Sequence, residues 1–267
     1  MTESFDADWL ALREAADHAA RPEALVESLR AHLAGRRVAG PLQVTDLGSG
    51  TGSNLRYLAP RLPPPQHWRL VDHDAGLLAR AGAPGAGIEL ERCVSDLADD
   101  PGAALAGGSS LVTGSALLDL VSEAWLDRLL AACAEQGAAV LFALSYDGRI
   151  RWSQPHALDA ELEDAVNRHQ RSDKGFGPAL GPTAAPACAA RLEGLGYGVQ
   201  TCASDWRIDA HRAALGVALI DGWVAAASAI DPGRAADLRA WGKARAVALA
   251  RGEVELTVGH QDVLGLR

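Results

Sequence analysis

The sequence predicts an α/β fold in which a mostly parallel sheet of seven strands is covered by helices on both faces. Short apolar strands alternate with amphipathic helices along the chain, which is typical of a parallel sheet with crossover helices. The strands show almost no polar alternation, as in AAVLFALSY at 138–146, and this indicates burial on both faces. With 267 residues, the chain is long enough for one large domain or one domain with additions.

Two helices are predicted before the first strand, at 6–20 and 22–34. Asp6 or Asp8 can cap the first, and Pro22 suits the first turn of the second. The strands are expected, in chain order, at 41–50, 67–74, 88–97, 109–118, 138–146, 197–206 and 253–266. The later helices are expected at 53–61, 74–81, 123–137, 158–170, 183–194, 211–229 and 234–251.

The segment VTDLGSGTGSN at 44–54 joins the first strand to the helix after it. Gly48, Gly50 and Gly52 form the turn, where the backbone needs unusual dihedral angles or must come close to a ligand. In a doubly wound sheet this turn lies at the carboxyl edge, where ligands bind. A dinucleotide fingerprint G-x-G-x-x-G/A that begins at Gly48 would end on Ser53, which is neither glycine nor alanine.

With Asp46 two positions before the first glycine, the turn resembles the first motif of the class I S-adenosylmethionine (SAM)-dependent methyltransferases, (D/E)-x-G-x-G-x-G. The resemblance is strongest over residues 40–150, and it implies a Rossmann-like fold with SAM as the cofactor. Asp72 ends the next strand, 20 residues after Gly52, where its carboxylate would hold the ribose hydroxyls. The resemblance also implies that Asp96 accepts a hydrogen bond from the adenine amino group.

The resemblance thus implies a set of eleven cofactor-binding residues. They are Asp46, Gly48, Ser49, Gly50, Gly52, Asp72, His73, Asp96, Leu97, Ser115 and Arg13. Structural alternatives stay open for the three aspartates. Asp46 could only support the glycine turn, and Asp96 could be a plain surface residue. Asp72 could cap the following helix, although Asp74 is better placed for that role.

The first helix carries Trp9, Arg13, Asp17 and Arg21 along one face, at intervals of four residues. One interpretation is two intrahelical ion pairs beside a buried Trp9. The other is a cap over the cofactor, in which Arg13 or Arg21 pairs with the methionine carboxylate of SAM. Both interpretations agree with N-terminal helices that cover the domain.

Residues that meet a substrate are expected after the fifth strand, at the same edge of the sheet as the cofactor. Tyr146 at the strand end could orient an acceptor, or it could pack in the core. His169 is the candidate general base near neutral pH, with a structural histidine as the alternative. Charge and amide groups that could bind a substrate are offered by Arg151, Asn167 and Lys174.

One domain with four parts is predicted. The parts are an N-terminal helical cap (1–38), a SAM-binding core (39–146), a substrate-side insertion (147–182) and a C-terminal part of the sheet with an inserted helix pair (183–267). Gly175, Gly177 and Gly181 would be the hinges of a lid. The helix pair at 211–251 departs from the simplest pattern of the family, a near-direct hairpin of the last strands. It therefore leaves their pairing open, and it could instead serve a dimer interface.

Composition disfavours several classes of partner, although a local basic groove could still exist. The net charge of −9 opposes DNA, RNA and anionic membranes. The apolar stretch 213–230 contains Asp221 and two glycines, so a buried helix explains it better than a membrane span. An acidic N-terminus and four cysteines without redox or zinc spacing indicate a cytoplasmic protein. No metal site is predicted, because Asp72-His73-Asp74 lacks a fourth ligand pattern.

The function predicted from these residues is SAM-dependent methyl transfer to a small-molecule acceptor, by a monomer or a homodimer. An NAD(P)-dependent oxidoreductase is disfavoured by Ser53 and Asp46. An aminopropyl transferase would need a carboxylate-rich loop after the fourth strand, which the sequence lacks. A non-catalytic SAM-binding module stays open, because the glycines of a binding turn survive a loss of activity.

Overall fold

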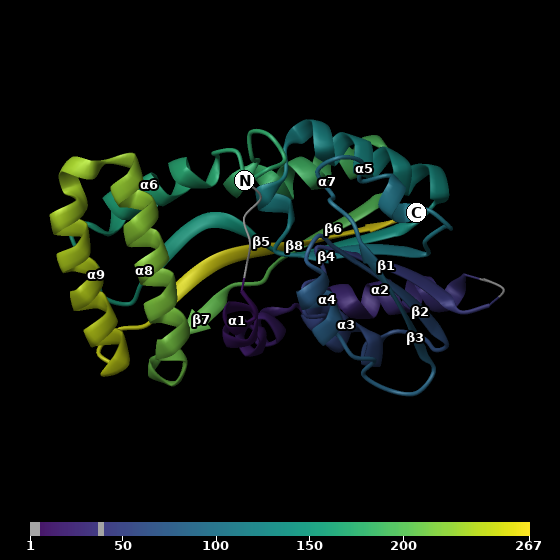
Figure 1. Ribbon diagram of the computed structural model, residues 1–267, viewed down its shortest axis with the longest axis horizontal. Coiled ribbons are helices and arrows are strands. Elements are labelled where there is room, and N and C mark those ends of the chain that lie inside the picture. Colours follow the sequence, from purple (N-terminus) through teal and green to yellow (C-terminus); the bar gives the residue numbers. More distant parts are fainter. Residues whose placement is uncertain (1–5, 37–39) are drawn as a thin grey trace.

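A computed structural model describes residues 6–36 and 40–267 of the chain. It contains one sheet with the strand order β3-β2-β1-β4-β5-β8-β6, and a short β7 pairs with β8 (Figure 1). The strands are β1 (Leu42–Leu47), β2 (Gln66–Asp72), β3 (Ile88–Val94), β4 (Leu111–Ser115), β5 (Ala139–Trp152), β6 (Gly198–Ala203), β7 (Trp206–Ile208) and β8 (Leu256–Leu266). The predicted α/β class with a mostly parallel sheet is confirmed, with eight strands instead of seven.

Strands β1 to β5 pair in parallel, and β8 runs antiparallel to both of its neighbours, β5 and β6. Gly265 of β8 lies opposite Val140 of β5 on one side and Val199 of β6 on the other. The last long strands therefore pair with each other although a helix pair separates them in the chain. This settles the pairing that the sequence left open.

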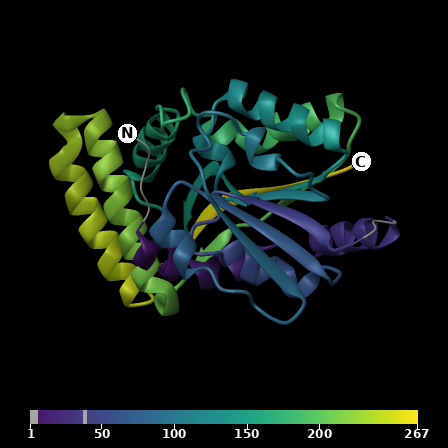
Figure 2. The same ribbon diagram turned by 45° about the vertical axis from the view of Figure 1, so that its right-hand side comes forward.

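Helices cover both faces of the sheet (Figure 2). They are α1 (Ala7–Ala20), α2 (Glu23–Gly35), α3 (Ser53–Leu58), α4 (Ala75–Arg80), α5 (Glu123–Gln136), α6 (Asp159–Gln170), α7 (Ala184–Gly194), α8 (Ala213–Ile230) and α9 (Ala235–Ala250). Val140 and Phe142 of β5 pack in the core with α5 and α7, whereas Ala139 and Leu141 pack with α2 and α3. Successive side chains point to opposite faces of a strand, so burial on both faces explains why this strand is apolar throughout.

Strand β5 is longer than predicted. It runs to Trp152 instead of ending at Tyr146, because the first half of β8 pairs with it as far as Leu256. β7 pairs with the other side of the same half of β8. These strands extend the sheet past its carboxyl edge, so the first six residues of the expected insertion at 147–182 belong to the sheet.

Helices α8 and α9 form a hairpin at one end of the molecule (Figures 1 and 2). Gly242 of α9 allows the close approach, because a methyl group there would lie 2.8 Å from Cγ2 of Val224. Among the described residues, one helix, Ala210–Ile230, is long and apolar enough to cross a membrane by length and composition, and 28% of its most apolar window is buried. The expected buried helix is thus buried along one face only, which includes Ile220 and Trp223.

The N-terminal helices take different positions. Asp6 caps α1 by accepting a hydrogen bond from the Trp9 N–H at 2.7 Å, as one of the two predicted alternatives. α2 packs in the core with the sheet, through Leu25 and Leu29. Residues 1–5 and 37–38 of the predicted cap, and residue 39 of the predicted core, lie outside the described residues.

Candidate cofactor and acceptor site

The glycine turn after β1 has the backbone conformation that its sequence requires. Gly48, Gly50 and Gly52 have φ values of +61°, +51° and +81°, in the left-handed region that other residues avoid. A methyl group at Gly50 would also lie 3.0 Å from Cδ1 of Leu10 on α1. Leu10 of α1 therefore packs directly against the backbone of the turn at Gly50, where a side chain would not fit.

Asp72, the last residue of β2, is held by two backbone groups. Its Oδ2 accepts a hydrogen bond from the Gly50 N–H at 2.8 Å, and its Oδ1 accepts one from the Asp74 N–H at 3.0 Å. The side chain is buried, and its orientation is fixed by these bonds. Each carboxylate oxygen keeps a lone pair for a further donor. Asp74, in turn, caps α4 through the N–H groups of Gly76 and Leu77.

A cavity lies beside this turn at the carboxyl ends of β1 to β4. Its lining residues are Leu10, Arg13, Gly48, Asp72, His73, Asp96, Leu97, Ser115, Ala116, Leu117, Leu120, Lys174 and Phe176. We call it the cofactor cavity. Seven residues of the predicted cofactor set line it: Arg13, Gly48, Asp72, His73, Asp96, Leu97 and Ser115. They come from five separate stretches of sequence, which the fold brings together.

Four residues of the predicted set lie outside the cofactor cavity. Gly50 and Gly52 shape the turn, and Ser49 N–H donates to the Val71 carbonyl at 3.1 Å. Asp46 lies fully buried, and its Oδ1 accepts a hydrogen bond from Nδ2 of Asn54 at 2.8 Å. Burial raises the pKa of Asp46 to about 7. The Asp46 side chain therefore bonds to α3, the helix that follows the turn, and does not line the cofactor cavity.

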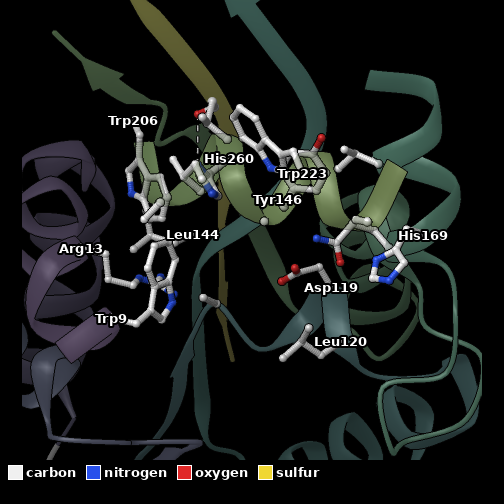
Figure 3. A pocket seen from close by; sticks show the side chains of 18 of the residues that line it. Trp9, Arg13, Asp119, Leu120, Leu144, Tyr146, His169, Trp206, Trp223 and His260 are labelled. Carbon is white, nitrogen blue, oxygen red and sulfur yellow. Dashed lines mark hydrogen bonds between the residues drawn. The ribbon is translucent and has the colours of Figure 1, made fainter. Parts of the chain in front are cut away.

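A second cavity of about 430 Å³ adjoins the first, and we call it the acceptor cavity. Figure 3 shows Trp9, Arg13 and Trp206 on one side of it and Asp119 and His169 on the other. The cofactor and acceptor cavities share four lining residues: Arg13, Ala116, Leu120 and Lys174. A ligand in one cavity would thus lie next to a ligand in the other.

Arg13 stands where the two cavities meet. Its Nε donates to Oδ2 of Asp17 at 2.9 Å, and its guanidinium lies over the Trp206 ring, 5.1 Å from the centroid. Arg13 therefore forms one of the two ion pairs of the first interpretation. It also borders the cofactor cavity, and its pairing with the methionine carboxylate stays a prediction. Arg21 differs, because its side chain is buried against Asp262 of β8.

Both predicted catalytic residues line the acceptor cavity. His169 lies on α6, with its Nδ1 3.4 Å from Nζ of Lys174. Tyr146 lies on β5 and is buried, and its hydroxyl oxygen has no hydrogen-bond partner among the described residues. Burial raises the pKa of Tyr146, and Glu163 raises it further. The phenol is therefore neutral and able to donate a hydrogen bond to a ligand.

His260 on β8 is a cavity residue that the sequence did not reveal. Its Nδ1 lies 3.1 Å from the Val258 carbonyl oxygen, which makes Nδ1 the protonated nitrogen of a neutral ring. Burial, followed by the nearby charge of Arg13, lowers the pKa of His260 to about 3. The opposite nitrogen, Nε2, is then a hydrogen-bond acceptor. No motif surrounds His260 in the sequence, so only the pairing of β8 with β5 could place it here.

Two of the predicted substrate-binding residues lie outside both cavities. The Arg151 guanidinium is exposed and forms an ion pair with Glu163 of α6. Nδ2 of Asn167 donates to the Gly148 carbonyl at 2.9 Å and ties α6 to β5. Arg151 points away from the cavities because β5 continues beyond Tyr146 as a strand. Asn167 lies on α6, and its amide is used by the bond to β5.

The third predicted residue, Lys174, is buried and lines both cavities. It belongs to the segment predicted to be a lid, where Gly175 and Gly177 both have positive φ. Oδ1 of Asp173 accepts hydrogen bonds from the N–H groups of these two glycines at 2.7 and 3.0 Å. Phe176 then packs edge-on against Trp125 of α5 and closes the cofactor cavity. The segment thus covers the place where the two cavities meet.

No protein-family model matches the sequence, and no curated protein matches it at a significant level. Solved structures match it in fold. A cyclopropane synthase from Mycobacterium tuberculosis gives a TM-score of 0.50 at 10% identity, with 98% of this chain and 94% of that chain covered. A SAM-dependent methyltransferase from Thiobacillus denitrificans, in complex with S-adenosyl-L-homocysteine, gives 0.43 at 17% identity, with 99% and 100% covered. This likeness is one of fold: the chain has a Rossmann-like fold, with a mostly parallel sheet between helices.

Proposed function

We propose that this chain is a SAM-dependent methyltransferase that acts on a small-molecule acceptor. One observation carries the proposal: a cavity lined by Gly48 and Asp72 meets a second cavity at Ala116 and Leu120. The first has the residues for a nucleoside cofactor. The second has a volume of about 430 Å³, which is in the range of sites for small organic molecules.

The residues of the cofactor cavity fit SAM. Asp72 is oriented by two backbone N–H groups and has lone pairs left for the ribose hydroxyls. Leu97 and Phe176 offer apolar surface to an adenine ring, and the exposed Asp96 stands at the rim to accept from its amino group. Arg13, between the two cavities, offers a cation to the methionine carboxylate.

The chemistry that bound SAM supplies is a methyl group on a positively charged sulfur, so the bond electrons return to sulfur when the methyl leaves. The protein therefore has to bring the acceptor close, align it and remove a proton where the acceptor carries one. We assign the alignment to Tyr146 and the proton removal to His169. The shared lining residues Ala116 and Leu120 form the passage through which the methyl group would travel.

The proposal includes the class of partner, the cellular location and the oligomeric state. The net charge of −9 favours a small molecule over a nucleic acid or an anionic membrane. All four cysteines are free thiols, and burial raises the pKa of Cys133 and Cys188 to about 12. Unreactive, unpaired thiols support a cytoplasmic location. A monomer or a homodimer is consistent with these features.

Isothermal titration calorimetry with SAM, S-adenosylhomocysteine, NAD and NADP tests the cofactor. We expect binding of the two sulfur nucleosides and none of the nicotinamide dinucleotides. Transfer of label from [methyl-³H]SAM to a panel of hydroxyl and amine acceptors then tests the activity. Binding of NADP without binding of S-adenosylhomocysteine would identify an oxidoreductase. Cofactor binding without transfer to any acceptor would identify a non-catalytic SAM-binding module.

A further inference from the structure

Aromatic rings wall the acceptor cavity from four elements. Trp9 comes from α1, Tyr146 from β5, Trp206 from β7 and Trp223 from α8. Figure 3 shows these side chains around one central space. Tryptophan and tyrosine rings attract other rings through offset-stacked or edge-to-face contacts in addition to the effect of apolar burial. The cavity therefore favours a planar apolar ligand over a flexible polar one.

The charged side chains of this cavity balance one another. Asp6 and Asp119 carry negative charge, and Arg13 and Lys174 carry positive charge. The lining thus has no excess of one sign that would draw in a charged acceptor, since a buried ligand charge would need a counter-ion of its own.

One face of α8 leaves room for the ligand. Ala218, Gly222 and Ala226 follow one another at intervals of four residues and line the cavity. A methyl group at Gly222 would meet no other atom within 4 Å. The absence of a side chain here is therefore not explained by packing within the protein. It leaves space in the cavity beside α8.

His260 also lines the cavity, and its hydrogen bond to the backbone fixes which ring nitrogen carries the hydrogen. The hydrogen bond to the Val258 carbonyl uses Nδ1, and Figure 3 shows the labelled imidazole among the residues around the cavity. Its Nε2 then has a lone pair and no hydrogen. Such a nitrogen binds a hydroxyl or N–H group and gains no hydrogen bond from an ether or a tertiary amine.

We propose that the acceptor is a planar, uncharged, largely apolar molecule that donates a hydrogen bond from a hydroxyl or N–H group to Nε2 of His260. This inference rests on the proposed function and specifies its substrate class. His260 acts as a binding residue that orients the acceptor through this group, and the proton that His169 removes comes from a second hydroxyl or N–H group, the one that receives the methyl. The small-residue face of α8 at Gly222 decides how large the acceptor can be.

Calorimetric titration of the full chain with three probes tests the proposal, with and without saturating S-adenosylhomocysteine. The probes are 1-naphthol, its methyl ether 1-methoxynaphthalene, and the saturated alcohol decahydro-1-naphthol. We expect 1-naphthol to bind about tenfold more tightly than the ether, which has no hydrogen to donate. We also expect it to bind about tenfold more tightly than the saturated alcohol, which cannot stack.

Two variants locate the binding. His260→Phe should remove the preference for 1-naphthol over the ether, while the ether still binds and thereby shows that the cavity is intact. Gly222→Leu should weaken both aromatic probes at least tenfold by filling the space on α8. Ala214→Leu, an exposed residue of the same helix outside the cavity lining, is the matched control and should leave all three affinities unchanged.

Equal binding of 1-naphthol and its ether to the wild-type chain would overturn the assignment of His260. Binding of no probe, or unchanged binding in Gly222→Leu, would overturn the substrate class and the role of α8. These results are distinct from a failure of the proposed function, which would be seen as a lack of S-adenosylhomocysteine binding. The titrations without that nucleoside test the acceptor cavity in either case.

Discussion

Nε of Arg21, directly after α1, donates a hydrogen bond to Oδ2 of Asp262 on β8 at 2.9 Å, and both side chains are at most 2% exposed. The other oxygen of Asp262 accepts from the Leu144 N–H at 2.8 Å, where β5 has a left-handed residue with φ +55°. Nη1 of Arg21 also donates to Asn54, which binds Asp46. One buried ion pair therefore connects the N-terminal helix, the wall of the acceptor cavity and the glycine turn.

Loss of either member of this pair should destabilise the fold by about 3–5 kcal/mol, because the remaining charge stays buried without a counter-ion. Arg21→Met and Asp262→Leu are the single changes, and urea denaturation measures the free energy of unfolding. The double variant should lose less than the sum of the two. Arg234→Met, at an ion pair with Glu161 on the surface, is the control and should leave the free energy of unfolding almost unchanged, because solvent screens an exposed pair. Strictly additive losses would contradict a coupled buried pair.

Asp72→Ala should weaken S-adenosylhomocysteine binding by roughly 1–3 kcal/mol, because charge-assisted hydrogen bonds to the ribose are lost. Asp74→Ala is the matched control two residues away. It removes the cap of α4 and should lower the free energy of unfolding by about 1 kcal/mol with no change in affinity. Calorimetry on both variants separates the two effects. Unchanged affinity in Asp72→Ala would show that the ribose binds elsewhere.

The pKa of Asp46 predicts a pH-dependent effect of Asp46→Asn. Burial raises this pKa from 3.8 to about 7 in the folded chain. The folded chain then keeps a proton that the unfolded chain releases between about pH 4 and pH 7, so wild-type stability falls as the pH rises. Relative to wild type, Asp46→Asn should gain on the order of 2–4 kcal/mol between pH 4 and pH 8. A constant difference over this range would rule out a buried, protonated Asp46.

The imidazole of His260 should stay neutral above about pH 4. Burial and Arg13 lower its pKa from 6.5 to about 3. Between these two pH values the unfolded chain binds a proton at this residue and the folded chain does not. His260 therefore contributes to a loss of stability as the pH falls from about 6.5 to 3. ¹⁵N NMR, with His260→Phe to assign the signal, should show a hydrogen on Nδ1 and no titration down to pH 4. A midpoint near 6.5 would contradict this.

Ala116→Gly should stabilise the fold. Ala116 follows β4 at the passage between the cavities and has φ +53°, which costs a residue with a side chain about 1 kcal/mol or more. Glycine relieves that strain and loses part of the gain through the entropy of the unfolded chain. Ala116→Val should instead destabilise, because a β-branched side chain is least tolerated at this φ. Urea denaturation of both variants checks the opposite signs.

The sequence predicted the sheet and the cofactor side of the site from local signals. Apolar strands between amphipathic helices predicted the α/β class, and the spacing of Gly48 and Gly50 predicted a turn that binds a ligand. Asp72 was recognisable because the carboxyl ends of parallel strands lie at the same edge of the sheet, so a residue that ends the second strand lies near the turn that follows the first. These features depend on residues that are neighbours in the chain, so their pattern can be read without a structure.

The acceptor side was decided by tertiary structure. Arg21 lies 241 residues from Asp262 in sequence, and no local pattern shows that the two meet in the core. His260 reaches the cavity because β8 runs antiparallel beside β5, whereas Arg151 leaves it because that same pairing prolongs β5. A strand's partner and register fix which side chains face a cavity, and they follow from the packing of the whole chain. The sequence by itself therefore determined the elements and the motif after the first strand. The tertiary structure decided which residues that are distant in sequence come into contact.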